Sequence, residues 1–169
     1  ASSELTDEDM TDIGSAIPKF TYGITLNLEY KGFDFTAFGT GVAGNKIFNI
    51  LYRADSPLRN SLKYYMDNAW TPENKGASMP AVNNVATDLN FWSSSAAMFN
   101  GSYFKIKQLQ LGYTLPKRLT QKVAIKDLRF FVSLDDFFTF SNYPGMDPET
   151  ATTGNNGGAG FDIGSYPTM

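Results

Sequence analysis

Period-two alternation over long segments is the feature that most constrains how this chain folds. Between about residues 19 and 30, one face is apolar or aromatic at six consecutive positions: Phe20, Tyr22, Ile24, Leu26, Leu28 and Tyr30. The intervening residues are polar or small. A helix would scatter these six side chains around its circumference, whereas a strand places all of them on one side of a sheet. The segment therefore predicts a strand that is apolar on one side only.

A second strand is expected at about 33–41, after a two-residue connection. Lys31-Gly32 suits a tight hairpin turn, because glycine accepts the backbone angles that such turns need. A two-residue hairpin pairs Tyr30 with Phe33 and brings the apolar sides of both strands onto one face. The hairpin is thus expected to be apolar on one side and polar on the other.

Two further strands are expected after a long connection. They span about 102–115 and 127–138, and both alternate over most of their length. In the third strand, Phe104 and Ile106 are out of phase with Leu109, which predicts either a β-bulge between them or a stretch buried on both sides. The four segments together predict an all-β, antiparallel fold.

The lengths of the strands and loops favour a membrane sheet over a soluble one. Roughly ten or more residues suffice to cross a bilayer at a tilt, whereas soluble strands average about five or six. The connections alternate between short (31–32 and 116–126) and long (42–101 and 139–164), as periplasmic turns and extracellular loops do in outer-membrane barrels. Since about eight strands are the minimum for a barrel, we expect this chain to be a fragment of a larger one.

Composition excludes several classes of function. The chain has no cysteine and no histidine, so it lacks disulfides, thiolate and imidazole metal ligands and the commonest general base. Its 14 basic residues are outnumbered by 17 acidic ones, which gives no electrostatic footprint for nucleic-acid binding. Asp135 and Asp136 point to opposite faces of a regular strand and form no catalytic pair, and Asp136 is expected at the external rim. We expect no enzymatic activity, no metal and no cofactor.

Short motifs along nearly the whole chain resemble those of one protein family, in its order and spacing. They are IGSAIPKFTYG (13–23), YKGFDF (30–35), GNKIFN (44–49), WTPEN (70–74), GSYFKIK (101–107), LGYTLP (111–116), FTF (138–140), YPGMDPE (143–149) and GSYP (164–167). The family is that of the SusC/RagA TonB-dependent transporters. The resemblance implies the C-terminal part of a 22-stranded transmembrane β-barrel, with the plug domain and the last strand outside this chain.

The resemblance also implies a function, which is TonB-dependent import of nutrient oligomers across the outer membrane. Oligosaccharides are the expected substrates, and peptides are the alternative. The expected partners are a SusD-like surface lipoprotein that acts as a lid, the TonB complex acting through the absent N-terminal region, and outer-membrane lipid. A periplasmic C-terminus would place residues 42–101 and 139–164 outside the cell.

Candidate contact residues divide between the long loops and the polar side of the sheet. Aromatic rings stack on sugars and anchor interfaces, so substrate or lid contacts are expected at Tyr64, Tyr65, Trp70, Trp92 and Tyr143. Polar residues of the inward face are expected to line the lumen, and these are Thr25, Asn27, Glu29, Arg129 and Ser133. Each group also has an ordinary alternative role, which is packing of the loops for the aromatic residues and contact with the plug or water for the polar ones.

Two other functions stay open at this point. A soluble carbohydrate-binding β-sandwich would have many shorter strands and two inner faces packed on each other. A non-transporting outer-membrane adhesin would be a barrel with no plug domain upstream.

Overall fold

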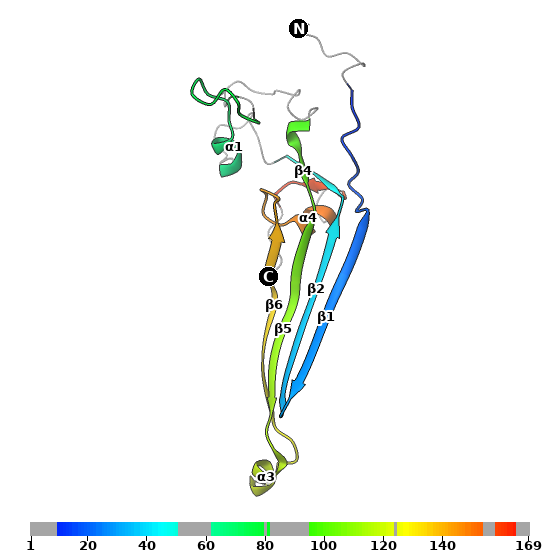
Figure 1. The fold of residues 1–169 in the computed structure, drawn as a ribbon, viewed down its shortest axis with the longest axis vertical. Coiled ribbons are helices and arrows are strands. Elements are labelled where there is room, and N and C mark those ends of the chain that lie inside the picture. Colours follow the sequence, from blue (N-terminus) through cyan, green and yellow to red (C-terminus); the bar gives the residue numbers. More distant parts are fainter. Residues whose placement is uncertain are drawn as a thin grey trace.

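A sheet of four long strands dominates the computed structural model, which describes residues 10–50, 62–79, 81, 95–123, 125–153 and 158–164. Within these residues the chain is mostly β, with a few short helices. The short elements gather beyond one end of the long sheet, and a small helical turn lies beyond the other end (Figure 1). We call these the loop end and the turn end.

The long sheet is antiparallel and has the strand order β1-β2-β5-β6. Its strands are β1 (Phe20–Tyr30), β2 (Phe33–Ala43), β5 (Tyr103–Thr114) and β6 (Arg129–Ser141). The sequence alone placed them at about 19–30, 33–41, 102–115 and 127–138. Each strand has 11 to 13 residues, about twice the length of an average soluble strand.

The β1–β2 hairpin has the register that its two-residue turn predicts. Tyr30 pairs with Phe33, and the pairing continues without a shift along the whole hairpin. Lys31 and Gly32 both have positive φ angles, 48° and 88°. The alternating apolar side chains of the two strands therefore lie on one face, as expected.

Two register shifts accumulate across the sheet. Lys107 of β5, between Ile106 and Gln108, is an extra residue that has no partner in β2. Opposite Lys107, β6 has two residues, which lie between Asp135 and Phe138. The bulge expected from the sequence is confirmed, and it returns the apolar residues on either side of it to one common face.

The second shift also decides where Asp136 lies. Its φ angle is 53°, which a residue other than glycine rarely adopts. Its carboxylate meets the polar side of the sheet, where Asp136 Oδ1 lies 2.9 Å from Lys107 Nζ. The expected position at the external rim is wrong, because Asp136 belongs to β6 and is ion-paired there.

The apolar face carries mainly aliphatic side chains, with Phe35 and Phe138 among them, between two rows of aromatic rings. The row at the loop end has ring centroids 5.6, 5.9 and 6.5 Å apart and consists of Phe20, Tyr22, Phe104 and Phe140. The row at the turn end, in register across the four strands, consists of Tyr30, Phe33, Tyr113 and Phe130. The distance from Phe20 to Tyr30 along β1 is about 33 Å, which at a tilt of about 40° leaves about 25 Å, the height of the lipid-facing band of a membrane barrel.

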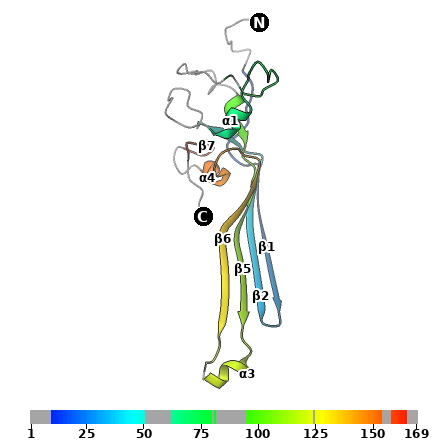
Figure 2. The same ribbon diagram turned by 90° about the vertical axis from the view of Figure 1, so that its left-hand side faces the viewer.

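This apolar face is uncovered among the described residues. Ile24 is 58% exposed, Leu28 55% and Val132 68%. A monomeric soluble protein rarely exposes so large a contiguous apolar surface. A soluble β-sandwich would need a second sheet here, but the second sheet of the structure has strands of only two to four residues and lies beyond the loop end (Figure 2).

Short elements from both long connections form a small loop body at the loop end. They are β3 (Lys46–Asn49), α1 (Lys63–Asp67), η2 (Ser95–Ala97), β4 (Met98–Asn100), α4 (Pro148–Thr153) and β7 (Phe161–Asp162). β3 pairs antiparallel with β4 and parallel with β7, which ties the two connections together. At the turn end, α3 (Lys117–Thr120) and η3 (Gln121–Val123) join β5 to β6. None of the helices in the described residues is long and apolar enough to span a membrane.

The tight turn at Gly32 generates the first testable prediction. A Cβ atom there would lie 2.8 Å from the backbone oxygen of Thr114, and the φ angle of 88° disfavours any side chain. Gly32→Ala is expected to lower the free energy of unfolding by about 1–2 kcal/mol. Gly23→Ala is the matched control, because a Cβ atom at this β1 position would make only ordinary contacts. Urea unfolding of the protein measures both, and equal effects of the two substitutions would contradict the turn geometry.

Candidate functional site

A charged pair crosses the polar face near the turn end. Arg129 of β6 donates from Nε to Asp34 Oδ1 at 3.0 Å and from a terminal nitrogen to Asp34 Oδ2 at 2.5 Å. The pair passes over Gly112 of β5, where a Cβ atom would lie 2.5 Å from the Asp34 carboxylate. The guanidinium also lies 5.1 Å from the ring centroid of Phe131. Two-pronged pairs of this kind are geometrically specific, so this one fixes β2 relative to β6 across the strand between them.

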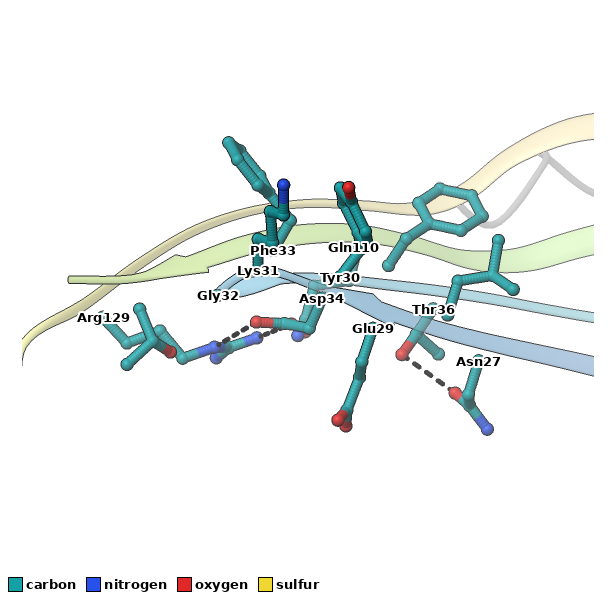
Figure 3. Close-up of a pocket in the computed structure, with 13 residues that line it drawn as sticks. Asn27, Glu29, Tyr30, Lys31, Gly32, Phe33, Asp34, Thr36, Gln110 and Arg129 are labelled. Carbon is teal, nitrogen blue, oxygen red and sulfur yellow. Dashed lines mark hydrogen bonds and ion pairs between the residues drawn. The ribbon is translucent and has the colours of Figure 1, made fainter. Parts of the chain in front are cut away.

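The same region of the polar face is hollowed. Its lining includes Asn27 and Glu29 of β1, Thr36 of β2 and Arg129 of β6. Figure 3 shows these polar side chains on one side of the sheet and Phe33 on the other. Thr36 donates a hydrogen bond of 3.0 Å to Asn27 Oδ1. Three of the five lumen candidates named from the sequence therefore meet in one hollow.

The other two lumen candidates lie on the same face, farther from the turn end. Thr25 is opposite Phe38, and Ser133 is opposite Gln110. Ser133 donates a hydrogen bond of 3.0 Å to Asp135 Oδ1. The structure thus brings all five candidates to the polar face without joining them in one cluster.

A second charged cluster occupies the polar face at the loop end. Its members are Lys105 and Lys107 of β5, Asp136 of β6, and Asp147 and Glu149 at the start of α4. Lys105 Nζ lies 3.2 Å from Asp147 Oδ2 and 3.0 Å from Glu149 Oε2. Lys107 Nζ lies 2.7 Å from Glu149 Oε1. We call these five residues the loop latch, because they attach α4 to the wall of the sheet.

The centre of the loop latch is buried. The side chains of Lys105 and Asp147 are only 1% and 2% exposed. Asp147 Oδ1 also accepts a 2.8 Å hydrogen bond from the backbone N–H of Glu149 and thereby caps the start of α4. Burying these charges is tolerable only because each has an oppositely charged partner within hydrogen-bond distance. The arrangement therefore holds α4 over the polar face rather than over the apolar one.

Two of the aromatic candidates, Tyr65 and Tyr143, lie inside the loop body. The Tyr65 hydroxyl donates to Asn49 Oδ1 at 3.2 Å, and Asn49 Nδ2 donates to the Tyr143 hydroxyl at 2.7 Å. The Tyr143 hydroxyl in turn donates to the carboxylate of Asp162. Burial, and then the bond to Asp162, raise the pKa of Tyr143 well above its usual range, so this phenol stays a hydrogen-bond donor. The network joins α1, β3 and β7 to the loop that follows β6.

The remaining aromatic candidates are placed differently. Tyr64 is half-buried and packs edge-on against Phe99, with a centroid distance of 5.5 Å. Trp70 is 44% exposed. Trp92 lies outside the described residues. Of the aromatic candidates that the structure describes, Trp70 is the exposed one.

Sequence reasoning missed the loop latch. The available signal was the pair Lys105 and Lys107, the only charges in an otherwise uncharged strand. Asp147 and Glu149 lie in the segment YPGMDPE (143–149), whose Pro-Gly and Asp-Pro pairs are typical of turns, and their approach to β5 depends on how the second long loop folds back. Among the described residues, no group of carboxylates is arranged to hold a metal ion.

Comparison with known proteins places this chain beside one class of receptor. No family model matches it. It is 34% identical over 176 residues to TonB-dependent receptor P3 of Formosa agariphila, a match that covers 99% of this chain and 17% of the receptor. TonB-dependent receptor P26 of the same bacterium is 26% identical, over 96% of this chain and 17% of its own length. The chain therefore spans about a sixth of the length of these curated relatives.

The fold is also found in solved structures. The RagAB peptide importer in its closed-closed state matches 99% of this chain and 18% of its own, with a TM-score of 0.72 and 23% identity. A structure of the RagAB peptide transporter covers 92% of this chain and 16% of its own, with a TM-score of 0.69 and 24% identity. At these identities the likeness shows a shared fold.

The loop latch generates the second prediction. Lys105→Met leaves the carboxylate of Asp147 buried without its partner, and breaking a buried pair in this way costs about 3–5 kcal/mol. We expect the loop that carries α4 to become sensitive to protease, while the double variant Lys105→Met/Asp147→Asn, which is neutral but keeps the helix cap, recovers much of the protection. Lys63→Met is the matched control. Lys63 and its partner Asp67 are both exposed, and exposed ion pairs of this kind contribute at most about 0.5 kcal/mol to stability. Equal sensitivity of the Lys63 and Lys105 variants would contradict the latch.

Proposed function

This chain is a SusC/RagA-like part of a TonB-dependent receptor, and from that premise we propose that it contributes strands to an outer-membrane β-barrel that imports nutrient oligomers. The observation that carries the proposal is the long sheet with one uncovered apolar face, edged by aromatic rows, and one polar face with ordered charges. A membrane barrel requires this division, because lipid surrounds its outside and water fills its inside.

Closure of the barrel requires strands from elsewhere in the parent protein. β1 and β6 form the two edges of the long sheet within the described residues. Unpaired backbone groups are not tolerated in lipid, so further strands must continue the sheet on both sides. We take the complete barrel to have 22 strands and to enclose a plug domain, with the TonB complex acting through the N-terminal region of the parent.

The polar face then lines the lumen. Thr25, Asn27, Glu29, Arg129 and Ser133 would face the plug, the passing solute or water. The hollow near the turn end, on the periplasmic side in this orientation, offers carboxylate, amide and guanidinium groups to a plug surface. The fixed pair of Asp34 and Arg129 would keep this part of the wall rigid while the plug rearranges.

The loop body would stand at the outer mouth, where residues 42–101 and 139–164 face the medium. Trp70, Tyr64 and Trp92 are the proposed contacts to a substrate or to a SusD-like lipoprotein lid, because an accessible aromatic ring can stack on a sugar or anchor an interface. Tyr65 and Tyr143 would act from within, by holding the loop body in shape. The loop latch would set how far α4 reaches over the mouth, because its ion pairs attach α4 to the sheet.

For the substrate we propose an oligosaccharide, with a peptide as the second candidate. Exposed aromatic rings and amide groups suit the apolar and hydroxyl faces of sugars. The peptide alternative is favoured by the likeness in fold to RagAB, which is named a peptide importer. Import by this route needs binding and rearrangement, and no covalent step.

Deletion of the parent gene tests the import function. Cells without it are expected to stop accumulating a fluorescent oligomer of the proper class, whereas uptake of the corresponding monomer continues. In wild-type cells, an uncoupler should abolish uptake of the oligomer, because the energy for TonB-dependent import comes from the inner membrane. Deletion cells that lose surface binding of the oligomer but keep its uptake would favour the non-transporting adhesin alternative. Oligosaccharide and peptide pools offered in parallel decide between the two substrate classes.

The lipid-facing assignment generates the third prediction. Ile24→Arg places a charge on the apolar face near the middle of β1 and is expected to cost about 2–4 kcal/mol, which lowers the amount of folded receptor in the outer membrane. Thr25→Arg, one residue away on the polar face, is the matched control and should leave that amount nearly unchanged. Heat-modifiable mobility in gel electrophoresis measures the folded fraction. A larger loss with Thr25→Arg would reverse the assignment of the two faces.

A further inference from the structure

The connection between β5 and β6 concentrates positive charge in an otherwise acidic chain. Residues 117–127 contain Lys117, Arg118, Lys122 and Lys126 against the single carboxylate of Asp127, a net charge of +3. The whole chain has a net charge of −3, so the other 158 residues together carry −6. We call residues 117–127 the basic turn.

The charged groups of the basic turn are accessible to a binding partner. All four basic side chains are exposed, and within the described parts of the chain none of them forms an ion pair. Apolar groups accompany them, since Leu119 is 48% exposed and Ile125 is 39% exposed. Leu119 and Ile125 therefore add apolar surface beside the cations, which is the composition of a segment that rests on a membrane surface.

The basic turn directly continues the wall of the sheet. The backbone N–H of Leu115 donates to Leu128 O at 2.9 Å. The pairing of β5 with β6 therefore continues toward the turn beyond Tyr113 and Phe130. Lys117 follows Tyr113, a member of the aromatic row at the turn end, by four residues. Figure 1 shows α3 just beyond the end of the long strands. In the proposed barrel this is the depth of the lipid headgroups, because aromatic rows mark the edge of the hydrocarbon.

A neighbouring lysine already points to the lipid side at this level. Lys31, in the turn between β1 and β2, places its Nζ 5.1 Å from the ring centroid of Tyr30, which belongs to the same aromatic row. Figure 3 shows Lys31 on the side of the sheet that carries Phe33. Long basic side chains that lie along apolar surface in this way carry their charge to the headgroup region.

We propose that the basic turn, together with Lys31, is a binding surface for anionic phospholipid headgroups of the periplasmic leaflet. This inference rests on the proposed barrel, because it needs the apolar face to be surrounded by lipid. The match is one of charge and depth, and each basic side chain near an anionic membrane surface contributes about fivefold to the binding constant. The interaction would fix the height of β5 and β6 in the membrane from the periplasmic side.

Native mass spectrometry of the intact receptor in detergent tests the inference. Phosphatidylglycerol and phosphatidylcholine with identical acyl chains are titrated separately onto the wild type and two triple variants. Lys117→Gln/Lys122→Gln/Lys126→Gln removes charge from the basic turn. Lys19→Gln/Lys63→Gln/Lys75→Gln removes the same number of exposed lysines at or beyond the loop end and is the matched control.

The wild type is expected to bind phosphatidylglycerol at least tenfold more tightly than phosphatidylcholine, with a preference that weakens as salt is raised. The variant of the basic turn should lose this preference at least tenfold, and the control should keep it within twofold. Equal binding of the two lipids, or equal losses in both variants, overturns the inference while leaving the barrel intact. A receptor that stays soluble without detergent overturns the proposed function as well.

Discussion

The register shared by four long strands is the constraint on which the rest of the structure depends. Side chains alternate with a period of two, so a slip of one residue in any strand would turn its apolar side chains into the polar face. The two-residue turn at Gly32 sets the first pairing, and the paired shifts at Ile106 and Asp136 keep the later pairings in phase despite their extra residues. One continuous apolar face results, and a lipid environment is the simplest way to cover it.

The polar face shows what the same register makes possible on the other side. Because Lys105 and Lys107 project there, they can hold α4 and thereby position the second long loop over the mouth of the sheet. The tyrosine network around Asn49 then connects that loop to the first one. The long sheet thus positions the loops, and the loops carry the aromatic rings that we propose as contacts. Removal of a charge from the polar face would therefore alter the position of the loop body.

Local alternation was enough to predict much of the sheet. The pairing of Tyr30 with Phe33 and the bulge before Leu109 were both visible in the phase of the apolar residues. The external-rim position of Asp136 was predicted wrongly, because β6 continues past it to Ser141. A kink that adds one residue to β6 turns its side chain onto the polar face. Tyr65 and Tyr143 both bond to Asn49, which lies 16 residues from the first and 94 residues from the second. Short-range periodicity carries no information about such contacts.

A nitroxide scan along β1 tests the central claim most directly. The chain has no cysteine, so single cysteines can be introduced at each position from 20 to 30 and labelled one at a time. Any cysteine elsewhere in the parent receptor is first replaced, so that no other thiol is labelled. In reconstituted membranes we expect accessibility to dissolved oxygen, which concentrates in lipid, to peak at the even-numbered positions. Accessibility to a water-soluble nickel complex should peak at the odd-numbered ones. An absence of this alternation, or equal access of the nickel complex to both faces, would contradict the membrane wall.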